Sequence, residues 1–336
     1  MKALYLMEQL FFKEREIPIP KVKKNEVLIK VKSVGVCGTD VHLWKHGKIG
    51  SCIIKKPIIL GHEFSGEIVN CGRNVSKLSI GDLVVVEPGE PCGKCEYCRK
   101  GRYNLCPEMK FFADPPHDGA LREYVTFDAS FVYRVPAGIS SEVATLVEPM
   151  AVGTFSTKKV NISLGDKVII YGSGVIGLCC LISALASGAS EIAIVDIREE
   201  RLHFAKKIGA DIILNSSKDS LNEYSSYFDV VYECTGASDC LIDASKRLKM
   251  GGKIAAIGVN ISSTQEAPIT EMIFKEQHFI PIFRYANVFH IAIDTIFKNI
   301  ETIKKFITHR FSFNDVEKAF ITATDDKNAL KVIINF

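Results

Sequence analysis

The chain has 336 residues, 47% of them hydrophobic and 24% charged, with a formal net charge of +3. The length is typical of two domains, and the composition excludes a disordered or fibrous protein. The small net charge excludes a strong general attraction to nucleic acid or acidic membranes. No apolar run is long enough to cross a bilayer, and the charged stretch at residues 1–20 does not resemble a signal peptide. We therefore expect a cytoplasmic protein with neither a membrane nor a nucleic-acid partner.

The predicted elements change in character along the chain. Residues 1–150 contain short β-like runs, separated by turn-forming residues, at 27–36, 63–69, 82–88 and 122–128. From about Leu164, apolar strands alternate with helices at 167–174 and 175–188, 191–197 and 198–210, 229–236 and 237–250, and then 253–259. The end of the chain is predicted to contain helices at 290–306 and 314–325, a short segment at 307–311 between them, and a strand at 329–336. This pattern predicts an α/β fold in which a β domain precedes a doubly wound parallel sheet.

Four of the eleven cysteines are clustered with the spacing C-x2-C-x2-C-x7-C, at Cys92, Cys95, Cys98 and Cys106. In a reducing compartment this spacing fits four thiolates around one tetrahedral zinc ion. Four thiolates leave no open coordination position, so this zinc is expected to be structural. The alternatives are unrelated thiols in a loop, and a nucleic-acid-binding zinc module, for which the flanking segments supply too few positive charges.

Residues 172–177, GSGVIG, match the G-x-G-x-x-G pattern directly after a predicted strand and at the start of a predicted helix. Gly172 allows a tight turn, Gly174 lets the backbone approach a pyrophosphate, and Gly177 lets the helix pack closely on the strand. The N-terminus of that helix offers N–H groups to phosphates. The pattern predicts a dinucleotide-binding domain.

An acidic residue, Asp196, ends the next predicted strand nineteen residues after Gly177. Its carboxylate can accept a hydrogen bond from a ribose 2′-hydroxyl and repels a 2′-phosphate, which favours NAD over NADP. Arg198 and Arg201 weaken this preference, because either could meet a phosphate. An exposed helix N-cap is the structural alternative for Asp196.

The front half of the chain carries a second set of possible metal ligands. Cys37, His62 and Glu63 are a thiolate, an imidazole and a carboxylate, and Glu148 is a fourth candidate. Taken singly each is a weak signal, since a lone histidine or cysteine is usually structural.

In order along the chain, CGTDVH, GHEFSG, the four-cysteine segment, EPMAVG and GSGVIG resemble the zinc-dependent medium-chain alcohol dehydrogenases. GRYNLC, FFADPPHDGALREYV, LVEPMAVG and IFRY further resemble the polyol branch, the sorbitol and xylitol dehydrogenases. The resemblance implies a GroES-like β catalytic domain over 1–150, a Rossmann domain over 151–286, and a return to the catalytic domain over 287–336. It also implies a homo-oligomer, either a dimer or a tetramer.

The resemblance also implies a chemistry. Cys37 and His62 ligate a catalytic zinc, and either Glu63 or Glu148 is the third protein ligand. The zinc acts as a Lewis acid on the substrate alcohol, whose carbon transfers a hydride to NAD, so that a polyol yields a ketose. Glu148 is the candidate general base, and Glu63 could share that task. Asp40 is expected to hydrogen-bond His62.

Further site residues follow from the same resemblance. Thr39 and His42 correspond to a hydroxyl–imidazole proton relay, with a surface histidine as the alternative for His42. The residues expected at the substrate, besides Glu148, are Phe111, Phe112, Arg284 and Tyr285. Core packing is the alternative for the two phenylalanines, and a subunit contact is the alternative for IFRY. The residues expected at the dinucleotide, besides the glycines and Asp196, are Ile176, Arg201, Gly258, Val259, Phe283 and Arg284.

One residue departs from the pattern. Leu43 stands where many sorbitol dehydrogenases carry a tyrosine that touches the polyol, so a shorter or less polar alcohol is an open alternative. The predicted function is reversible, zinc- and NAD-dependent oxidation of a polyol. An amino-alcohol oxidation like that of threonine dehydrogenase is the alternative enzyme activity. A protein that binds nucleic acid through its four-cysteine segment is the alternative from another class.

Overall fold

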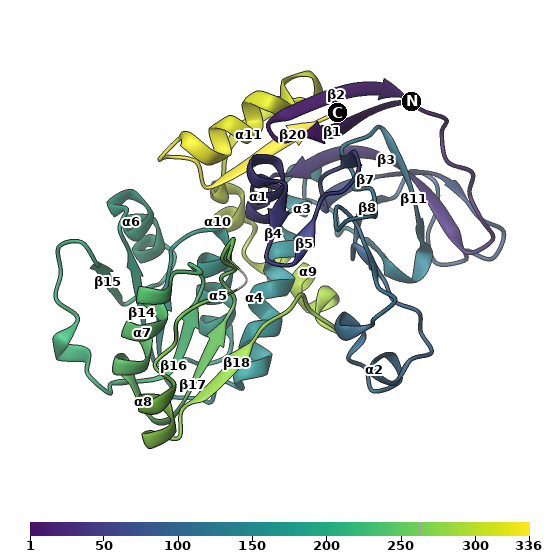
Figure 1. Cartoon of the computed structure of the whole chain (residues 1–336). Coiled ribbons are helices and arrows are strands. Elements are labelled where there is room, and N and C mark those ends of the chain that lie inside the picture. The colour runs from purple at the N-terminus through teal and green to yellow at the C-terminus, as the bar shows by residue number, and fades with distance from the viewer. Residues whose placement is uncertain (263) are drawn as a thin grey trace. The chain divides into compact units, whose positions relative to one another are not determined.

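The computed structural model describes residues 1–262 and 264–336. The chain divides into two compact units, shown as part of the whole chain in Figure 1. Unit 1 comprises Met1–Glu148 and Phe289–Phe336, and unit 2 comprises Pro149–Val288. Among the described residues, no helix has the combination of length and apolar character that a membrane crossing requires.

Unit 1 is built around a seven-stranded sheet in the order β12-β8-β7-β3-β20-β19, with β11 paired to β3. Its strands are β3 (Glu26–Gly35), β7 (Glu63–Cys71), β8 (Leu83–Val86), β11 (Tyr124–Asp128), β12 (Val132–Arg134), β19 (Ile307–Ser312) and β20 (Lys331–Asn335). A three-stranded sheet joins β1 (Lys2–Glu8), β2 (Phe11–Glu16) and β6 (Ile58–Ile59). Two small pairs are β4 (Lys48–Ile49) with β5 (Cys52–Ile53) and β9 (Gly89–Glu90) with β10 (Lys110–Phe111).

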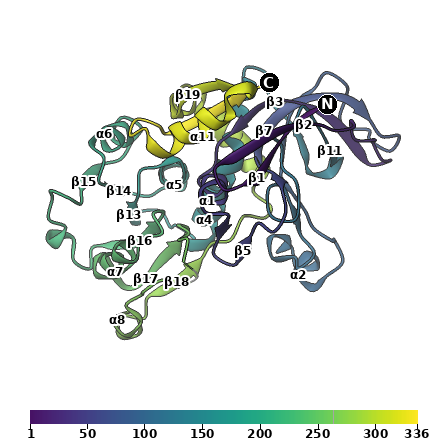
Figure 2. The same ribbon diagram turned by 45° about the horizontal axis from the view of Figure 1, so that its top comes forward.

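The C-terminal strand β20 enters this sheet beside β3, far away in the sequence. It runs antiparallel to β3, with Ile333 opposite Gly35 and Ile334 opposite Val34. Figures 1 and 2 both show the yellow C-terminal segment beside the purple N-terminal strands. The pairing brings residues near 331 next to the end of β3, where the first candidate metal ligand follows.

Helices complete unit 1. The longer ones are α1 (Gly38–His46), α9 (Phe289–Lys298) and α11 (Val316–Asp325), and the short ones are α2 (Glu96–Arg99), α3 (Ser141–Ala144) and α10 (Ile300–Ile303). The ring of Phe320 on α11 lies 5.1 Å from that of Phe12 and 5.7 Å from that of Trp44. These contacts place the core of unit 1 between α1, α11 and the strands.

Unit 2 is a six-stranded parallel sheet in the order β15-β14-β13-β16-β17-β18. The strands are β13 (Lys167–Tyr171), β14 (Glu191–Asp196), β15 (Ile212–Asn215), β16 (Phe228–Glu233), β17 (Leu248–Ala256) and β18 (His278–Pro281). The helices are α4 (Val147–Val160), whose first two residues belong to unit 1, α5 (Val175–Ala186), α6 (Glu199–Lys207), α7 (Ser238–Arg247) and α8 (Ile269–Phe274). Strand order reverses at β13 and β16, which is the switch point of a doubly wound sheet.

Two expected helices differ in their bounds. The helix expected over 237–250 ends at Arg247, because the chain at Leu248 already pairs with Phe228 as the first residue of β17. The helix expected over 290–306 is divided into α9 and α10 with a short 3-10 turn after them. Short α1, which carries several of the site residues, was not predicted from the β-like pattern of the front half.

Candidate metal centres and cofactor site

Three of the predicted ligands meet at one end of the unit 1 sheet. Gly35 at the end of β3 pairs with Glu63 at the start of β7, so Cys37, which follows β3, and His62, which precedes β7, come to the same place. One ligand atom each of Cys37, His62 and Glu63 lies within 4.8 Å of the others. Thiolate, imidazole and carboxylate are the donors that zinc prefers, so these residues fit a zinc ion with a fourth position left for substrate.

Neighbouring side chains hold these ligands in place. Nδ1 of His62 lies 3.4 Å from Oδ1 of the buried Asp40, which leaves Nε2 as the nitrogen available to a metal. The hydroxyl of Thr39 donates to Sγ of Cys37 at 3.2 Å. Burial lowers the pKa of His62, but Asp40 and Cys37 raise it by more, and the result is well above its ordinary value. A metal ion must displace that proton, so its binding depends on pH.

A buried lysine is the partner of Glu63. Lys331 is 2% exposed, its Nζ donates to the carbonyl oxygen of Val36 at 3.1 Å, and it forms an ion pair with Oε2 of Glu63. Burial lowers the pKa of Lys331, but Glu63, Cys37 and Glu148 raise it by more. Lys331 is therefore a cation in the middle of the candidate site.

Glu148 lies near this cluster but not within it. It is buried in the first turn of α4 and close enough to Lys331 to raise the pKa of the ammonium. Within the described part of the chain, the group of convergent ligand atoms contains Glu63 and not Glu148. The geometry thus favours Glu63 as the third ligand and leaves Glu148 as a nearby carboxylate.

The other residues expected around this site differ in their surroundings. The ring of Phe111 lies 5.7 Å from that of His62, whereas Phe112 packs against the rings of Phe64 and Phe127 at 5.7 and 5.0 Å. Phe112 is therefore packed against the hydrophobic core, which was the alternative to a place at the substrate. Leu43 is likewise a member of the hydrophobic core of unit 1.

His42 lies one helical turn after Thr39 on α1, so both side chains are on the same face of the helix. Its ring is stacked at 6.2 Å on that of His46. Burial lowers the pKa of His42, and the neighbouring His46 and Lys45 lower it further. His42 is therefore neutral at pH 7 and able to accept a proton.

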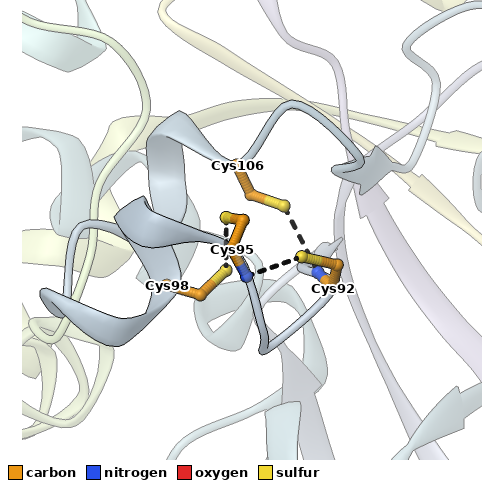
Figure 3. Close-up of side chains that lie close together, drawn as sticks. All are labelled: Cys92, Cys95, Cys98 and Cys106. Carbon is orange, nitrogen blue, oxygen red and sulfur yellow. Dashed lines mark hydrogen bonds between the residues drawn. The ribbon is translucent and has the colours of Figure 1, made fainter.

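The four clustered cysteines converge around α2, and their side chains point toward one another (Figure 3). The N–H of Cys92 donates to Sγ of Cys106 at 3.3 Å, and the N–H of Cys95 donates to Sγ of Cys92 at 3.4 Å. Backbone N–H groups of Lys94 and Cys95 lower the pKa of the Cys92 thiol to about 7. Four convergent sulfur atoms fit a closed, structural zinc site.

The glycine-rich turn lies between β13 and α5. Gly172 has a φ of 94°, a conformation that favours glycine, and a Cβ atom at Gly177 would overlap the carbonyl oxygen of Gly172. Gly174 is the N-cap of α5, and Ile176 lies in its first turn. The turn therefore brings open backbone to the N-terminus of a buried helix, as a pyrophosphate site requires.

Asp196 lies at the end of β14, next to this turn. Its Oδ2 accepts from the N–H and the hydroxyl of Ser173 at 2.7 and 2.8 Å, and its Oδ1 accepts from the N–H groups of Ile197 and Arg198 at 2.7 and 3.0 Å. These four donors fix the direction of the carboxylate. The predicted ribose contact is therefore held rigidly at the C-terminal edge of the parallel sheet.

The remaining cofactor residues lie at the same edge of the unit 2 sheet. Arg201 is on α6, next to Asp196, and its Nη1 approaches the space beside Gly174. The other expected cofactor residues follow β17 and β18, and they are Gly258, Val259, Phe283 and Arg284. Tyr285, which was expected at the substrate, comes directly after them. The guanidinium carbon of Arg284 lies 4.6 Å from the centroid of the Phe283 ring, and Tyr285 is 3% exposed. In doubly wound sheets, ligands bind at this edge.

Two residues of these sites were missed from the sequence. Lys331 is the one charged residue within the otherwise apolar run ALKVII, a signal that could have marked it. Ser173 lies inside the glycine motif, where only the glycines were interpreted.

Comparisons with known proteins agree with this geometry. Residues 23–137 match the alcohol dehydrogenase GroES-like domain family, and residues 175–298 match the zinc-binding dehydrogenase family. The predicted fold class, a GroES-like β domain with a Rossmann-type parallel sheet, is thereby confirmed.

The chain is 37% identical to the sorbitol dehydrogenase of Bacillus subtilis (strain 168), over 99% of this chain and 97% of that protein. It is 38% identical to the sorbitol dehydrogenase of Bos taurus, over 94% of this chain and 91% of that protein. The crystal structure of L-idonate 5-dehydrogenase from Escherichia coli str. K-12 substr. MG1655 has a TM-score of 0.93 to this structure at 28% identity, covering 100% of this chain and 98% of that one. The chain therefore belongs to the zinc-dependent medium-chain alcohol dehydrogenase family, in the branch that contains the sorbitol dehydrogenases.

Proposed function

We propose that this protein catalyses the reversible oxidation of a secondary alcohol of a polyol to a ketose, with NAD as the hydride acceptor. The convergence of Cys37, His62 and Glu63 within 4.8 Å carries the proposal, because it supplies the open metal site that alcohol oxidation needs. The identity of 37–38% to sorbitol dehydrogenases supports a polyol rather than an amino alcohol such as threonine.

In this proposal, Cys37, His62 and Glu63 hold a zinc ion, which when bound supplies Lewis-acid polarisation of the substrate oxygen. Asp40 keeps Nδ1 of His62 occupied, so that the ring presents Nε2. The hydroxyl of Thr39 stabilises the Cys37 thiolate through its hydrogen bond. The four-cysteine segment holds a second, structural zinc ion and takes no part in the reaction.

The chain offers two routes for the alcohol proton. The carboxylate of Glu148 is buried close to the cluster and is the proposed general base, and Glu63 could share this task. Thr39 and His42, on one face of α1, form the second route, because the neutral His42 ring can accept a proton passed through the Thr39 hydroxyl. In unit 2, Asp196 is the proposed ribose partner that favours NAD over NADP.

The test is turnover of a panel of polyols and of threonine with NAD, followed by NADH absorbance, with metal counted per chain. We expect activity on at least one polyol and two zinc ions per chain. Cys37→Ser should abolish turnover and leave NADH binding intact. Cys71→Ser, at the other end of β7, is the matched control and should remain active. Turnover of threonine but of no polyol would overturn the proposed substrate class.

We also propose that the protein is a homo-oligomer in the cytoplasm. Strand β18 is the edge of the unit 2 sheet, and exposed apolar side chains lie on it and before it, at Ile273, Phe274 and Phe279. An unpaired strand edge with apolar neighbours supports self-association. Among residues 1–262 and 264–336 no two cysteines are joined in a disulfide, which supports a reducing compartment. A sedimentation mass equal to one chain would contradict the oligomer, and disulfides in protein from its native source would contradict the compartment.

A further inference from the structure

The ion pair of Lys331 with Glu63 is unusual because both side chains are buried. Each residue is 2% exposed. Lys331 begins β20 and is separated from Glu63 by 268 residues. A buried charge is costly unless it is paired, and removing one partner leaves the other uncompensated. The arrangement therefore needs a reason beyond stability.

The geometry fixes one oxygen of the Glu63 carboxylate. Oε2 is bound by the Lys331 ammonium, and a Cβ atom added at Gly35 would lie 2.5 Å from it, so only glycine leaves room there. Lys331 is itself held by the carbonyl oxygen of Val36 and by the pairing of β20 with β3. Oε2 is thus enclosed by the sheet, and Oε1 is the oxygen left for another partner.

The charges around the metal site also favour a cation at Lys331. With a metal bound, Cys37 is a thiolate, and Glu63 and Glu148 add two carboxylates close to Lys331. A divalent ion neutralises two of these three negative charges. The Lys331 ammonium neutralises the third, in a place where water is excluded.

We propose that Lys331 is a positioning residue of the metal site, whose ammonium holds Oε2 of Glu63 so that the other oxygen ligates the ion beside Cys37 and His62. This inference rests on the proposed catalytic metal site. In this role Lys331 acts through Glu63 and contacts neither substrate nor cofactor.

The experiment measures metal binding rather than turnover. Cobalt is bound to wild type, Lys331→Met and Lys331→Arg, and its affinity for each protein is measured by competition with a chelator. The visible spectrum of cobalt-loaded Cys37→Ser protein is subtracted, so that the remaining spectrum is that of the catalytic site. Loss of a residue that orients a ligand typically weakens metal affinity by about 10–100-fold, and we expect this in Lys331→Met together with a changed cobalt spectrum. Lys331→Arg, which keeps the charge, should recover part of the affinity.

Two controls separate this role from a general effect. Lys318→Met removes the same charge from an exposed pair with Asp315 on α11, and it should leave the cobalt affinity unchanged. The four-cysteine site should keep its metal in every variant. If wild type binds only one metal per chain, the proposed catalytic site is wrong. If wild type binds two metal ions per chain, and Lys331→Met binds the ion of the catalytic site at least as tightly as wild type does, the proposed role of Lys331 is wrong.

A double variant keeps the test decisive if Lys331→Met does not fold. Glu63→Gln/Lys331→Met replaces both charges of the buried pair with neutral side chains and is compared with Glu63→Gln alone. Since Lys331 acts through the Glu63 carboxylate, the second substitution should not weaken cobalt binding further. A further tenfold loss in the double variant would show that Lys331 acts by another route, and would overturn the inference.

Discussion

Replacing Asp196 with alanine tests both the cofactor site and the way in which the fold builds it. The carboxylate accepts four hydrogen bonds, two of them from Ser173. Ser173 is fully buried, whereas the neighbouring Ile197 is 65% exposed. After the substitution, water can accept a hydrogen bond from the N–H of Ile197, but the N–H and the hydroxyl of Ser173 lose their acceptor.

The expected magnitudes follow from these contacts. A buried donor without a partner costs about 1–3 kcal/mol, so the two Ser173 donors predict a loss of about 2–4 kcal/mol in unfolding free energy, since the hydroxyl can rotate toward another acceptor. A hydrogen bond from ribose to a charged group contributes about 1.5–3 kcal/mol, so NAD affinity should fall roughly 10–100-fold. NADP should lose less, because the charge that repels its 2′-phosphate is removed.

Asp196→Asn is the matched control, because it keeps an acceptor for Ser173 but not the negative charge. We expect it to shift preference toward NADP with a smaller loss of stability than Asp196→Ala. The measurements are NADH and NADPH dissociation constants by fluorescence titration, and urea unfolding of each variant. An unchanged ratio of the two constants would remove Asp196 from the ribose site. A changed ratio with unchanged stability would refute the account of the Ser173 donors.

Two further predictions concern unit 1. Cys95→Ser should remove one zinc ion per chain and lower Tm by several degrees, while Cys71→Ser should do neither; unchanged metal content and Tm in Cys95→Ser would count against a structural zinc. Burial raises the pKa of Glu87, although Tyr103 and Tyr133 donate to its two oxygens at 2.7 and 3.2 Å and oppose the shift. Because the folded pKa is raised, the stabilising contribution is present at acidic pH and is lost as pH rises through the folded value. The unfolding free energy of wild type minus that of Glu87→Gln should therefore fall as pH rises above the ordinary glutamate pKa, and a difference that stays constant or rises would contradict this.

Features that depend on neighbours in the sequence were predictable from local spacing. The four cysteines lie within one short segment, so their convergence needs only a tight loop and the short helix α2. The glycine motif specifies a strand, a turn and a helix through steric demands at individual positions, as the φ of Gly172 illustrates. The alternation of apolar strands and helices likewise indicated the parallel sheet, because burial on both faces leaves a continuous apolar run.

Contacts between distant segments depended on the tertiary structure. The pairing of Lys331 with Glu63 follows from the register of β20 against β3, and no local pattern encodes which strand becomes the neighbour of another. The same holds for Phe112, whose place among Phe64 and Phe127 rather than beside His62 is set by packing across strands. Hydrophobic periodicity specifies which face of an element is buried, whereas the partner on that face is selected only when the whole sheet assembles.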